Sequence, residues 1–265
     1  MIDPRAIIDP SAVLGEGVTI GPWTIIGADV EIGDGVEVAS HVVIKGPTKI
    51  GAGCRIFQFA TVGEDTPALA YGGEASRLDI GEHTIIREGV TIHRGMAKGG
   101  IGRTEVGSHC LLMAYVHIGH DCIVGDHVIM ANNASIAGHV TVGDYANFGG
   151  YSGIPQFRAI GPYTHIAAMS LVTKDVPAYM TVTGNPAYAA GMNIEGMRRR
   201  GYDKTLIKAL RESYRLVYRK GLLVKEALEE MQSLRAAHAE VEAFAASIEA
   251  SEWGIIRGRG QSASD

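Results

Sequence analysis

Apolar residues recur every six positions along most of this chain. In a register that begins at Ala6, the third residue of every hexad is apolar, and only two insertions interrupt the repeat. These third positions are Ile8, Leu14, Ile20, Ile26, Ile32, Val38, Ile44, Ile50, Ile56, Val62, Ile80, Ile86, Ile92, Val106, Leu112, Ile118, Val124, Met130, Ile136, Val142, Phe148, Ile154, Ile160, Ile166 and Val172. The fourth position is often glycine, and the first is mostly small or β-branched. A hexapeptide period of this kind predicts a parallel β-helix.

Three hexads, or eighteen residues, would form one triangular coil of this solenoid. Each hexad would supply a short strand and a turn, and each strand would pair with the same face of the next coil. Glycine and asparagine suit the unusual φ angles of the tight corners. The repeat ends near Asp175, and an extended segment with Pro177 and a Gly184-Asn185-Pro186 turn follows. We therefore expect an all-β solenoid domain over residues 1–190.

The C-terminal part of the chain has a helical period instead. Leu206, Leu210, Tyr214 and Val217 form one apolar stripe, which Asp203 can cap at its start and Gly221 can end. A second helix is predicted through Leu223, Ala227, Met231 and Leu234, and a third includes Val241, Phe244 and Ile248. We expect a helical domain over residues 191–257 that packs on the solenoid or on a neighbouring subunit, and a disordered polar tail over 258–265.

Composition and charge narrow the classes of protein. The formal net charge is −5, from 24 Lys and Arg against 29 Asp and Glu, which argues against a nucleic-acid binder. Cys54, Cys110 and Cys122 each open a hexad and lack the CxxC spacing of metal sites, so we interpret them as small core residues. We find no signal peptide and no apolar run long enough to span a membrane, which is typical of a cytoplasmic protein without membrane insertion.

The numbering places the candidate chemistry on one corner of the prism. The hexads 60–65, 90–95, 116–121, 134–139 and 152–157 should share one face. Both insertions, Thr66 to Arg77 and Met96 to Arg103, leave the end of that face, and loops on a rigid scaffold often carry function.

Several polar residues meet beside that edge. His120 should lie one coil before Gly138 and two coils before Gln156, and Asp121 should stack under His139. Arg94 is the equivalent of His120 one coil earlier, and His117 points outward from the same hexad.

This cluster suggests general-base catalysis. A histidine beside a carboxylate is oriented and made a better base, and a glycine next to it offers a backbone N–H to an oxyanion. No Ser or Cys obviously pairs with His120 as a nucleophile, so direct transfer is preferred. Two alternatives remain: the histidines occupy solvated corners, or His117 and His120 bind a metal through their HxxH spacing. On a strand these two residues lie on opposite sides, so we predict no metal site.

Several motifs resemble one enzyme family over nearly the whole chain. The run His117-Ile118-Gly119-His120-Asp121-Cys122 is followed by Ala131-Asn132-Asn133 and Ala137-Gly138-His139-Val140. Further matches are Val90-Thr91-Ile92-His93-Arg94-Gly95, Gln156-Phe157 and the segment Asn193 to Gly201. Together these are similar to the acyl-carrier-protein-dependent UDP-N-acetylglucosamine O-acyltransferases of lipid A biosynthesis.

The resemblance implies a fold and a reaction. It implies a left-handed β-helix, although right-handed crossovers are the general rule. It also implies a homotrimer with active sites between subunits, and transfer of a 3-hydroxyacyl chain from acyl carrier protein to the 3-position of a UDP-amino sugar. The carrier thioester would be a co-substrate, and no cofactor or metal is expected.

The resemblance also implies residue roles. His120 would be the base, Asp121 its support and Gly138 the oxyanion donor. His117 and His139 would contact the sugar or its phosphates, and Gln156 would line the same cleft. Residues expected to hold the nucleotide are Asn193, Glu195, Arg199 and Arg200. The acyl chain would end against Ala168, and Met169 is the alternative residue for this stop.

Two segments depart from the family pattern. The first insertion reads Pro67-Ala68-Leu69-Ala70-Tyr71 where the family usually has Gln-Asp-Leu-Lys-Tyr, and Pro155 replaces a usual histidine before Gln156. Both changes affect the pocket rather than His120. The sequence alone therefore leaves three alternatives open. The first is a paralogous acyltransferase that uses another sugar, an amine acceptor or another acyl donor. The others are a β-helical zinc hydro-lyase and a non-catalytic scaffold. The sequence does not fix the acyl length.

Overall fold

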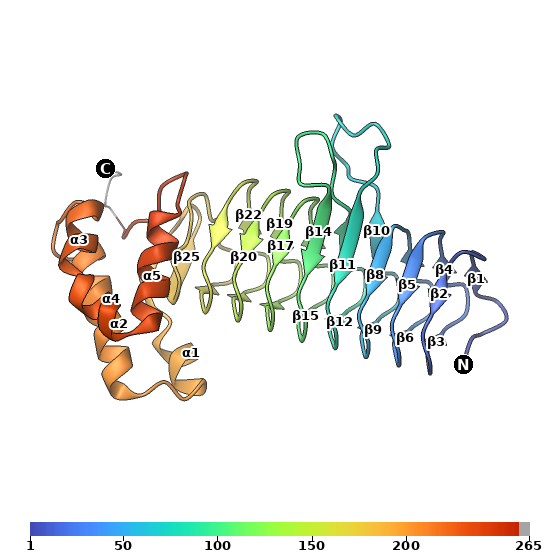
Figure 1. Cartoon of the computed structure of the whole chain (residues 1–265), viewed down its shortest axis with the longest axis horizontal. Helices are drawn as coiled ribbons and strands as arrows, with labels where there is room; N and C mark the ends of the chain where they lie inside the picture. Colours follow the sequence, from blue (N-terminus) through green and yellow to red (C-terminus); the bar gives the residue numbers. More distant parts are fainter. Residues whose placement is uncertain (260–265) are drawn as a thin grey trace.

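A computed structural model describes residues 1–259 of the chain and shows a left-handed parallel β-helix followed by a small helical bundle (Figure 1). The three faces of the prism are parallel sheets, and from β4 to β24 each strand pairs with the strand three positions earlier in the chain. We call them the first, second and third face.

The strands of each face follow the hexapeptide register. The first face contains β1 (Ile7–Ile8), β4 (Ile25–Ile26), β7 (Val43–Ile44), β10 (Thr61–Glu64), β13 (Thr91–His93), β16 (His117–Ile118), β19 (Ser135–Ile136) and β22 (Gly153–Ile154). The second contains β2 (Val13–Leu14), β5 (Val30–Ile32), β8 (Thr48–Ile50), β11 (Arg77–Ile80), β14 (Arg103–Val106), β17 (Ile123–Val124), β20 (Thr141–Val142) and β23 (Ala159–Ile160). The third contains β3 (Thr19–Ile20), β6 (Glu37–Val38), β9 (Arg55–Ile56), β12 (Ile85–Ile86), β15 (Leu111–Leu112), β18 (Ile129–Met130), β21 (Asn147–Phe148), β24 (His165–Ile166), β25 (Met180–Gly184) and β26 (Ala187–Met192).

The apolar third positions form the core. Ile92, Ile118 and Ile136 are directly paired along the first face and fully buried. Removing such side chains from water is the main driving force for the fold, at roughly 25 cal/mol for each Å² of apolar surface. All three cysteines are buried and free, which agrees with their interpretation as core residues.

The corners use fewer glycines than the sequence suggests. Many corner positions with positive φ carry histidine or an aromatic residue, and on one edge these side chains stack in a continuous column. Successive ring centroids along this column are 4.6 to 5.2 Å apart. The column consists of His83, His109, His127, Tyr145, Tyr163 and Tyr179. Each aromatic pair stabilises the fold by about 0.5–1.5 kcal/mol. This is comparable to the cost of about 1–2 kcal/mol for placing a non-glycine residue in the left-handed backbone conformation.

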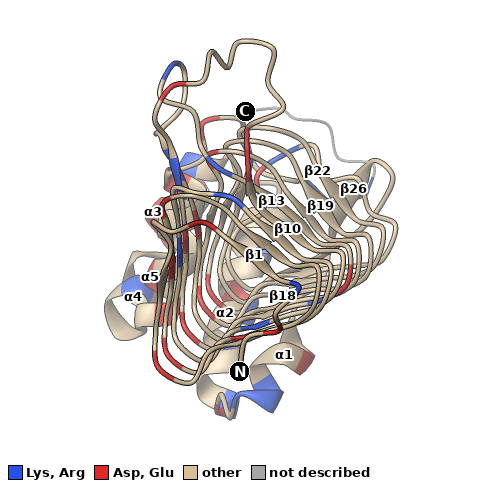
Figure 2. Ribbon diagram, turned by 90° about the vertical axis from the view of Figure 1, so that its right-hand side faces the viewer, with Lys and Arg blue, Asp and Glu red and all other residues tan. Residues whose placement is uncertain are grey.

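The two insertions leave one edge of the prism, as the numbering predicts. The first loop, residues 65–76, connects β10 to β11, and the second, residues 94–102, connects β13 to β14. Both rise from the edge between the first and second faces (Figures 1 and 2). This edge lies opposite the third face.

The end of the solenoid forms a β-hairpin, whereas the sequence predicted only an extended segment. β25 continues the third face next to β24, and β26 returns antiparallel to it after the predicted turn. Hairpin formation gives the backbone of this segment hydrogen-bond partners that a single extended strand at the end of the sheet would lack.

The helical part differs from the prediction in two places. Asp203 caps α2 (Lys204–Tyr218) as expected, by accepting a hydrogen bond from the Leu206 N–H at 2.8 Å. The single helix predicted through Leu223 to Leu234 is divided at Met231 into α3 (Val224–Glu230) and α4 (Gln232–Ala237). The third predicted helix is α5 (Ala239–Glu249). A short helix that the sequence analysis missed, α1 (Ile194–Arg199), lies on the third-face side of the prism, away from the loops (Figures 1 and 2).

After α5 the chain returns to the solenoid. Ile255 pairs with Asp175, and Gly258 pairs with Ala189, so the predicted disorder does not begin at residue 258. The rest of the predicted tail, residues 260–265, lies outside the described residues. Across the described helices, none combines the length and apolarity needed to cross a membrane.

Candidate functional site

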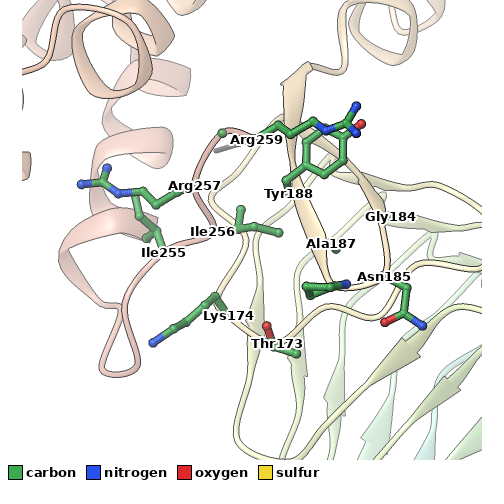
Figure 3. A pocket seen from close by; sticks show the side chains of 12 residues that line it. Thr173, Lys174, Gly184, Asn185, Ala187, Tyr188, Ile255, Ile256, Arg257 and Arg259 are labelled. Atoms are coloured by element: carbon green, nitrogen blue, oxygen red, sulfur yellow. The ribbon is translucent and has the colours of Figure 1, made fainter. Parts of the chain in front are cut away.

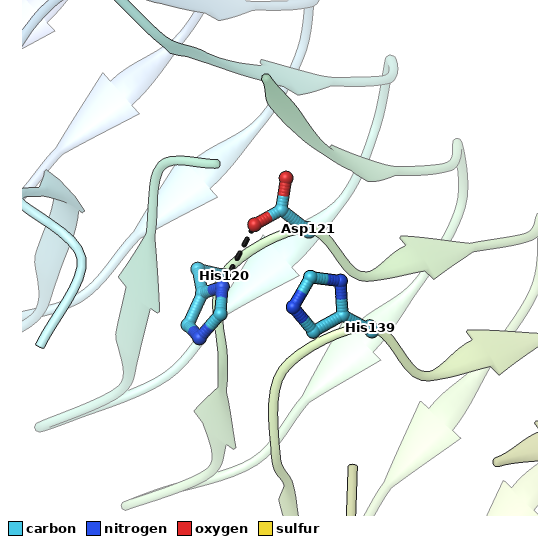
Figure 4. A group of neighbouring side chains, drawn as sticks. All are labelled: His120, Asp121 and His139. Carbon is cyan, nitrogen blue, oxygen red and sulfur yellow. Dashed lines mark hydrogen bonds and ion pairs between the residues drawn. The ribbon is translucent and has the colours of Figure 1, made fainter. Parts of the chain in front are cut away.

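His120 and Asp121 form a buried pair in the turn after β16. The His120 Nδ1 lies 2.7 Å from the Asp121 Oδ2, and only 5% and 3% of the two residues is exposed (Figure 4). A carboxylate oxygen accepts, so the Nδ1–H of His120 donates to it, and in a neutral imidazole with this tautomer Nε2 carries the lone pair. We call the edge formed by His120, Asp121, Gly138 and His139 the His120 corner.

The second loop holds the carboxylate of Asp121. The backbone N–H groups of Met96, Ile101 and Gly102 donate to it at 3.1, 2.8 and 3.1 Å. A Cβ on Gly100 would lie 2.5 Å from both carboxylate oxygens, so this glycine is required for the close approach. The loop that the sequence marks only as an insertion therefore orients the acid.

Gly138 lies against His120, where the eighteen-residue coil places it. A Cβ at this position would be 2.7 Å from the His120 Nε2, so any side chain would collide with the imidazole. Gly138 is buried, yet its N–H donates to no acceptor among residues 1–259. An unpaired N–H beside the free nitrogen of a histidine is the arrangement that an oxyanion needs.

The other residues predicted to line the substrate site lie around the His120–Asp121 pair and differ in their contacts. The His139 ring lies perpendicular to that of His120, with 4.9 Å between centroids, and stacks on Phe157 at 4.5 Å. His117 lies on β16, and its Nδ1 is hydrogen-bonded to the Thr91 hydroxyl at 2.8 Å. Burial lowers the pKa of both His117 and His139, so these imidazoles are neutral near pH 7. Gln156 follows on the same edge and is exposed.

Arg94 anchors the first loop, a role that the sequence analysis did not assign. Its buried guanidinium donates to the Gly63 carbonyl at 2.6 Å, pairs with the Asp65 carboxylate and reaches the Tyr71 hydroxyl at 3.4 Å. The tip of this loop is exposed, Leu69 completely so. The family departures at Pro67, Ala68 and Ala70 therefore lie on a segment that is anchored at its base.

The four predicted nucleotide residues meet elsewhere, in a cavity of about 580 Å³ over the third face. The residues that line this third-face pocket are Ile129, Tyr145, Asn147, His165, Asn193, Glu195, Gly196, Arg199 and Arg200. Asn193 caps α1 by accepting from the Gly196 N–H at 3.0 Å and donates to the Tyr163 carbonyl at 2.9 Å. The Arg200 guanidinium lies 4.6 Å from the centre of the Tyr145 ring.

The two clusters lie on opposite sides of one chain. The His120 corner is the edge between the first and second faces, whereas the third-face pocket rests on β18, β21 and β24. A single protomer therefore does not join the predicted base to the predicted nucleotide residues. Tyr145, Asn147 and His165 were missed because their outward positions carry no motif.

Ala168 and Met169 belong to neither cluster. Both lie exposed in the turn after β24, at the edge between the third and first faces. Met169 has a φ of 58° and is 72% exposed, so in one chain nothing closes a channel around it.

A further cavity of about 640 Å³ lies between the β25–β26 hairpin and the returning C-terminal segment (Figure 3). Lys174 and Arg259 contribute cationic side chains, and the Arg259 guanidinium lies 5.8 Å from the centre of the Tyr188 ring. None of the predicted site residues lines it.

The metal alternative based on HxxH spacing is not the arrangement observed. His117 is bonded to Thr91, whereas the ligand atoms that converge are those of His120, Asp121 and His139, all within 4.8 Å of one another. No other such group of His, Cys, Asp and Glu occurs within residues 1–259.

Comparisons with known proteins find related sequences over nearly the whole chain. A family model described as UDP N-acetylglucosamine O-acyltransferase, domain 2, matches residues 175–256, and a bacterial transferase hexapeptide model matches 11–46 and 103–138. The acyl-[acyl-carrier-protein]–UDP-N-acetylglucosamine O-acyltransferase of Stutzerimonas stutzeri is 55% identical over 257 residues, which cover 97% of this chain and 99% of the relative.

Solved structures superpose over the same length. LpxA from Acinetobacter baumannii is 49% identical, with a TM-score of 0.94 and coverage of 97% of this chain and 99% of that one. The UDP-N-acetylglucosamine O-acyltransferase of Moraxella catarrhalis is 46% identical, with a TM-score of 0.95 and the same coverage.

Proposed function

Because the chain belongs to the family of UDP-N-acetylglucosamine O-acyltransferases, we propose that His120 is the general base of an acyl transfer to the sugar's 3-hydroxyl. The chain transfers an acyl group from acyl carrier protein to UDP-N-acetylglucosamine in lipid A synthesis. The observation that carries the residue roles is the free Nε2 of His120 beside the unpaired N–H of Gly138.

The proposed step is a direct transfer. The sugar hydroxyl gives its proton to Nε2 while its oxygen attacks the thioester carbonyl, and the Gly138 N–H binds the resulting oxyanion. When the C–S bond breaks, the thiol sulfur of the carrier takes the proton back from Nε2. Asp121 stabilises the imidazolium between these two transfers.

A covalent enzyme intermediate is not needed. Cys122, the nearest sulfur in sequence, is fully buried, and its thiol donates to the Ala137 carbonyl at 3.0 Å. Burial raises the pKa of this thiol to about 12, so it is not a thiolate near pH 7. The reaction as written also needs no cofactor, because the thioester supplies the activated acyl group.

The acceptor and donor are tested together. We expect purified protein to acylate UDP-N-acetylglucosamine with a 3-hydroxyacyl carrier, and mass spectrometry to find the ester. A UDP-sugar with an amino group in place of the 3-hydroxyl tests whether the enzyme is a paralogue that acylates an amine. A carrier whose acyl chain lacks the 3-hydroxyl tests whether the enzyme requires that hydroxyl on the donor. Faster transfer to the amine, or equal use of the plain chain, would contradict this part of the proposal.

We propose a homotrimer whose active sites lie between protomers. The support is the separation of the His120 corner from the third-face pocket, because a second protomer can bring its third face to the corner. Mixing two weakened variants, His120→Ala and Arg199→Ala, tests this directly. Mixed trimers should contain some sites with both native residues, so activity at low UDP-sugar should exceed that of either variant alone.

The control for the mixing experiment is the same mixture without subunit exchange. A separate check is the mass of the native protein in solution, which should be three times 28.1 kDa. No recovery after proven exchange would mean that each site belongs to one chain. The cytoplasmic location inferred from the sequence stays a prediction, which fractionation of cells that produce the protein would test.

A further inference from the structure

We propose that His120, Asp121 and His139 bind one divalent zinc ion per corner, and that this ion switches the general base off. The ion is not required for turnover; it is an inhibitory ligand. Its binding rests on the geometry alone, whereas its effect on activity rests on the proposed role of His120.

The three side chains supply a donor set that suits zinc. Two imidazole nitrogens and one carboxylate oxygen lie within 4.8 Å of one another, and the His120 Nδ1 and Asp121 Oδ2 atoms are 2.7 Å apart. Bond lengths to zinc place tetrahedral ligand atoms about 3.3 Å apart, so small side-chain rotations would complete the set. A water molecule would fill the fourth position.

The surroundings hold one ligand firmly and leave another free to adjust. The backbone N–H groups of the second loop fix Asp121, as outer hydrogen bonds do in metal sites. No residue of the described chain hydrogen-bonds the His139 imidazole, which packs against the rings of His120 and Phe157. Figure 4 shows its ring beside both other ligands. His139 is only partly buried, so an ion can reach the group from solvent.

The ion would act through the tautomer of His120. Zinc takes the lone pair of Nδ1, so the ring proton moves from Nδ1 to Nε2 and no net proton is lost. Nε2 then carries a hydrogen and has no lone pair to accept the proton of the sugar hydroxyl. The hydrogen bond between His120 and Asp121 is replaced by two bonds to the ion.

The donor set also predicts selectivity. Mg²⁺ and Ca²⁺ prefer oxygen ligands in larger numbers, whereas two imidazoles and one carboxylate suit Zn²⁺ or Co²⁺. We expect zinc and cobalt to bind, and magnesium and calcium not to bind at this group.

The test is a titration of metal-free, full-length protein with Zn²⁺ by calorimetry and with Co²⁺ by visible absorption. We expect one ion per protomer, and at least tenfold weaker binding in His139→Asn and in Asp121→Asn. Two matched controls replace histidines outside the group. His117→Asn lies on the first face and His109→Asn lies in the aromatic column, and both variants should bind the ion as tightly as the native protein. Binding that is unchanged in His139→Asn, or no binding at all, would overturn the proposal.

Activity separates this inference from the proposed function. Zinc should lower kcat of the native enzyme, and a chelator should restore it, while equal magnesium has no effect. If the ion binds through His139 and activity is unchanged, the role of His120 as base fails and the metal site stands. If His120→Ala is inactive but no ion binds, the metal site fails and the base stands.

Discussion

The His120 corner and the third-face pocket are built in opposite ways. The side chains of His120 and Asp121 are 7% and 0% exposed, whereas those of Arg199 and Glu195 are 76% and 63% exposed. The first pair is fixed by the solenoid and the second loop before any substrate arrives. The second pair is surrounded by solvent and makes one ion pair at 3.2 Å. Changes at the corner should therefore lower kcat, and changes at the pocket should raise KM.

The largest expected effect comes from the base itself. His120→Ala should lower kcat by about 10²- to 10⁴-fold, because it removes the general base from the corner. Binding of the UDP-sugar should survive, since the third-face pocket is untouched. Steady-state kinetics and calorimetry measure the two effects.

His109→Ala provides the control, because His109 is exposed and stacks in the aromatic column on another edge. It should leave kcat near the native value. A His120→Ala variant with ordinary substrate and near-native kcat would remove the corner from the mechanism.

The loop that holds Asp121 should matter almost as much. Gly100→Ala places a methyl group 2.5 Å from both carboxylate oxygens, so either the acid or the loop must shift. A displacement of about 1 Å at a catalytic group costs roughly 10²-fold in rate. We expect kcat to fall while KM for the UDP-sugar stays the same.

Gly72→Ala is the matched change in the first loop, where the added Cβ would meet only the Glu74 side chain at 3.6 Å. It should have little effect on kcat. Equal loss of kcat in both variants would show that general loop stability, rather than the position of Asp121, sets the rate.

The pocket should respond in KM. Arg199→Ala removes one guanidinium from the residues that line the third-face pocket, and we expect KM for the UDP-sugar to rise about tenfold, as for one charge-assisted hydrogen bond. kcat should change less. Arg198→Ala is the control, because Arg198 is exposed on the same helix but does not line the pocket. If both variants raise KM equally, the run of arginines acts only through its overall charge.

Sequence reasoning reached the corner because a solenoid converts numbering into position. His120, Gly138 and Asp121 stand in a strict six-residue register, so their contacts follow once the coil length is known. It did not reach the contacts that loops make, because backbone N–H groups such as that of Ile101 leave no sequence signal.

The helical part shows the same limit. Asp203 and the stripe that follows it predicted α2, because a cap and an apolar face are local features. The break at Met231 and the short α1 depend on packing between distant segments, which propensity does not report. Only the four nucleotide residues of the third-face pocket were predicted, and those came from family motifs. Its strand residues, such as Asn147, have no period of their own and were missed.

The smallest expected effect concerns the acyl chain. The family resemblance makes Ala168 the stop of the chain, yet Ala168 and Met169 are both exposed in the single protomer. They can limit a chain only if a neighbouring protomer closes the groove over them, so this prediction depends on the trimer. Ala168→Met should then shorten the preferred donor, because each methylene left outside the channel forfeits roughly 0.8 kcal/mol, or about fourfold in preference. Met169→Gly is the companion variant and should lengthen the preferred donor if Met169 is the stop instead. Both are compared with the native enzyme across carriers of increasing acyl length. If neither variant moves the optimum, the channel ends elsewhere, and the edge between the third and first faces takes no part in selecting the donor.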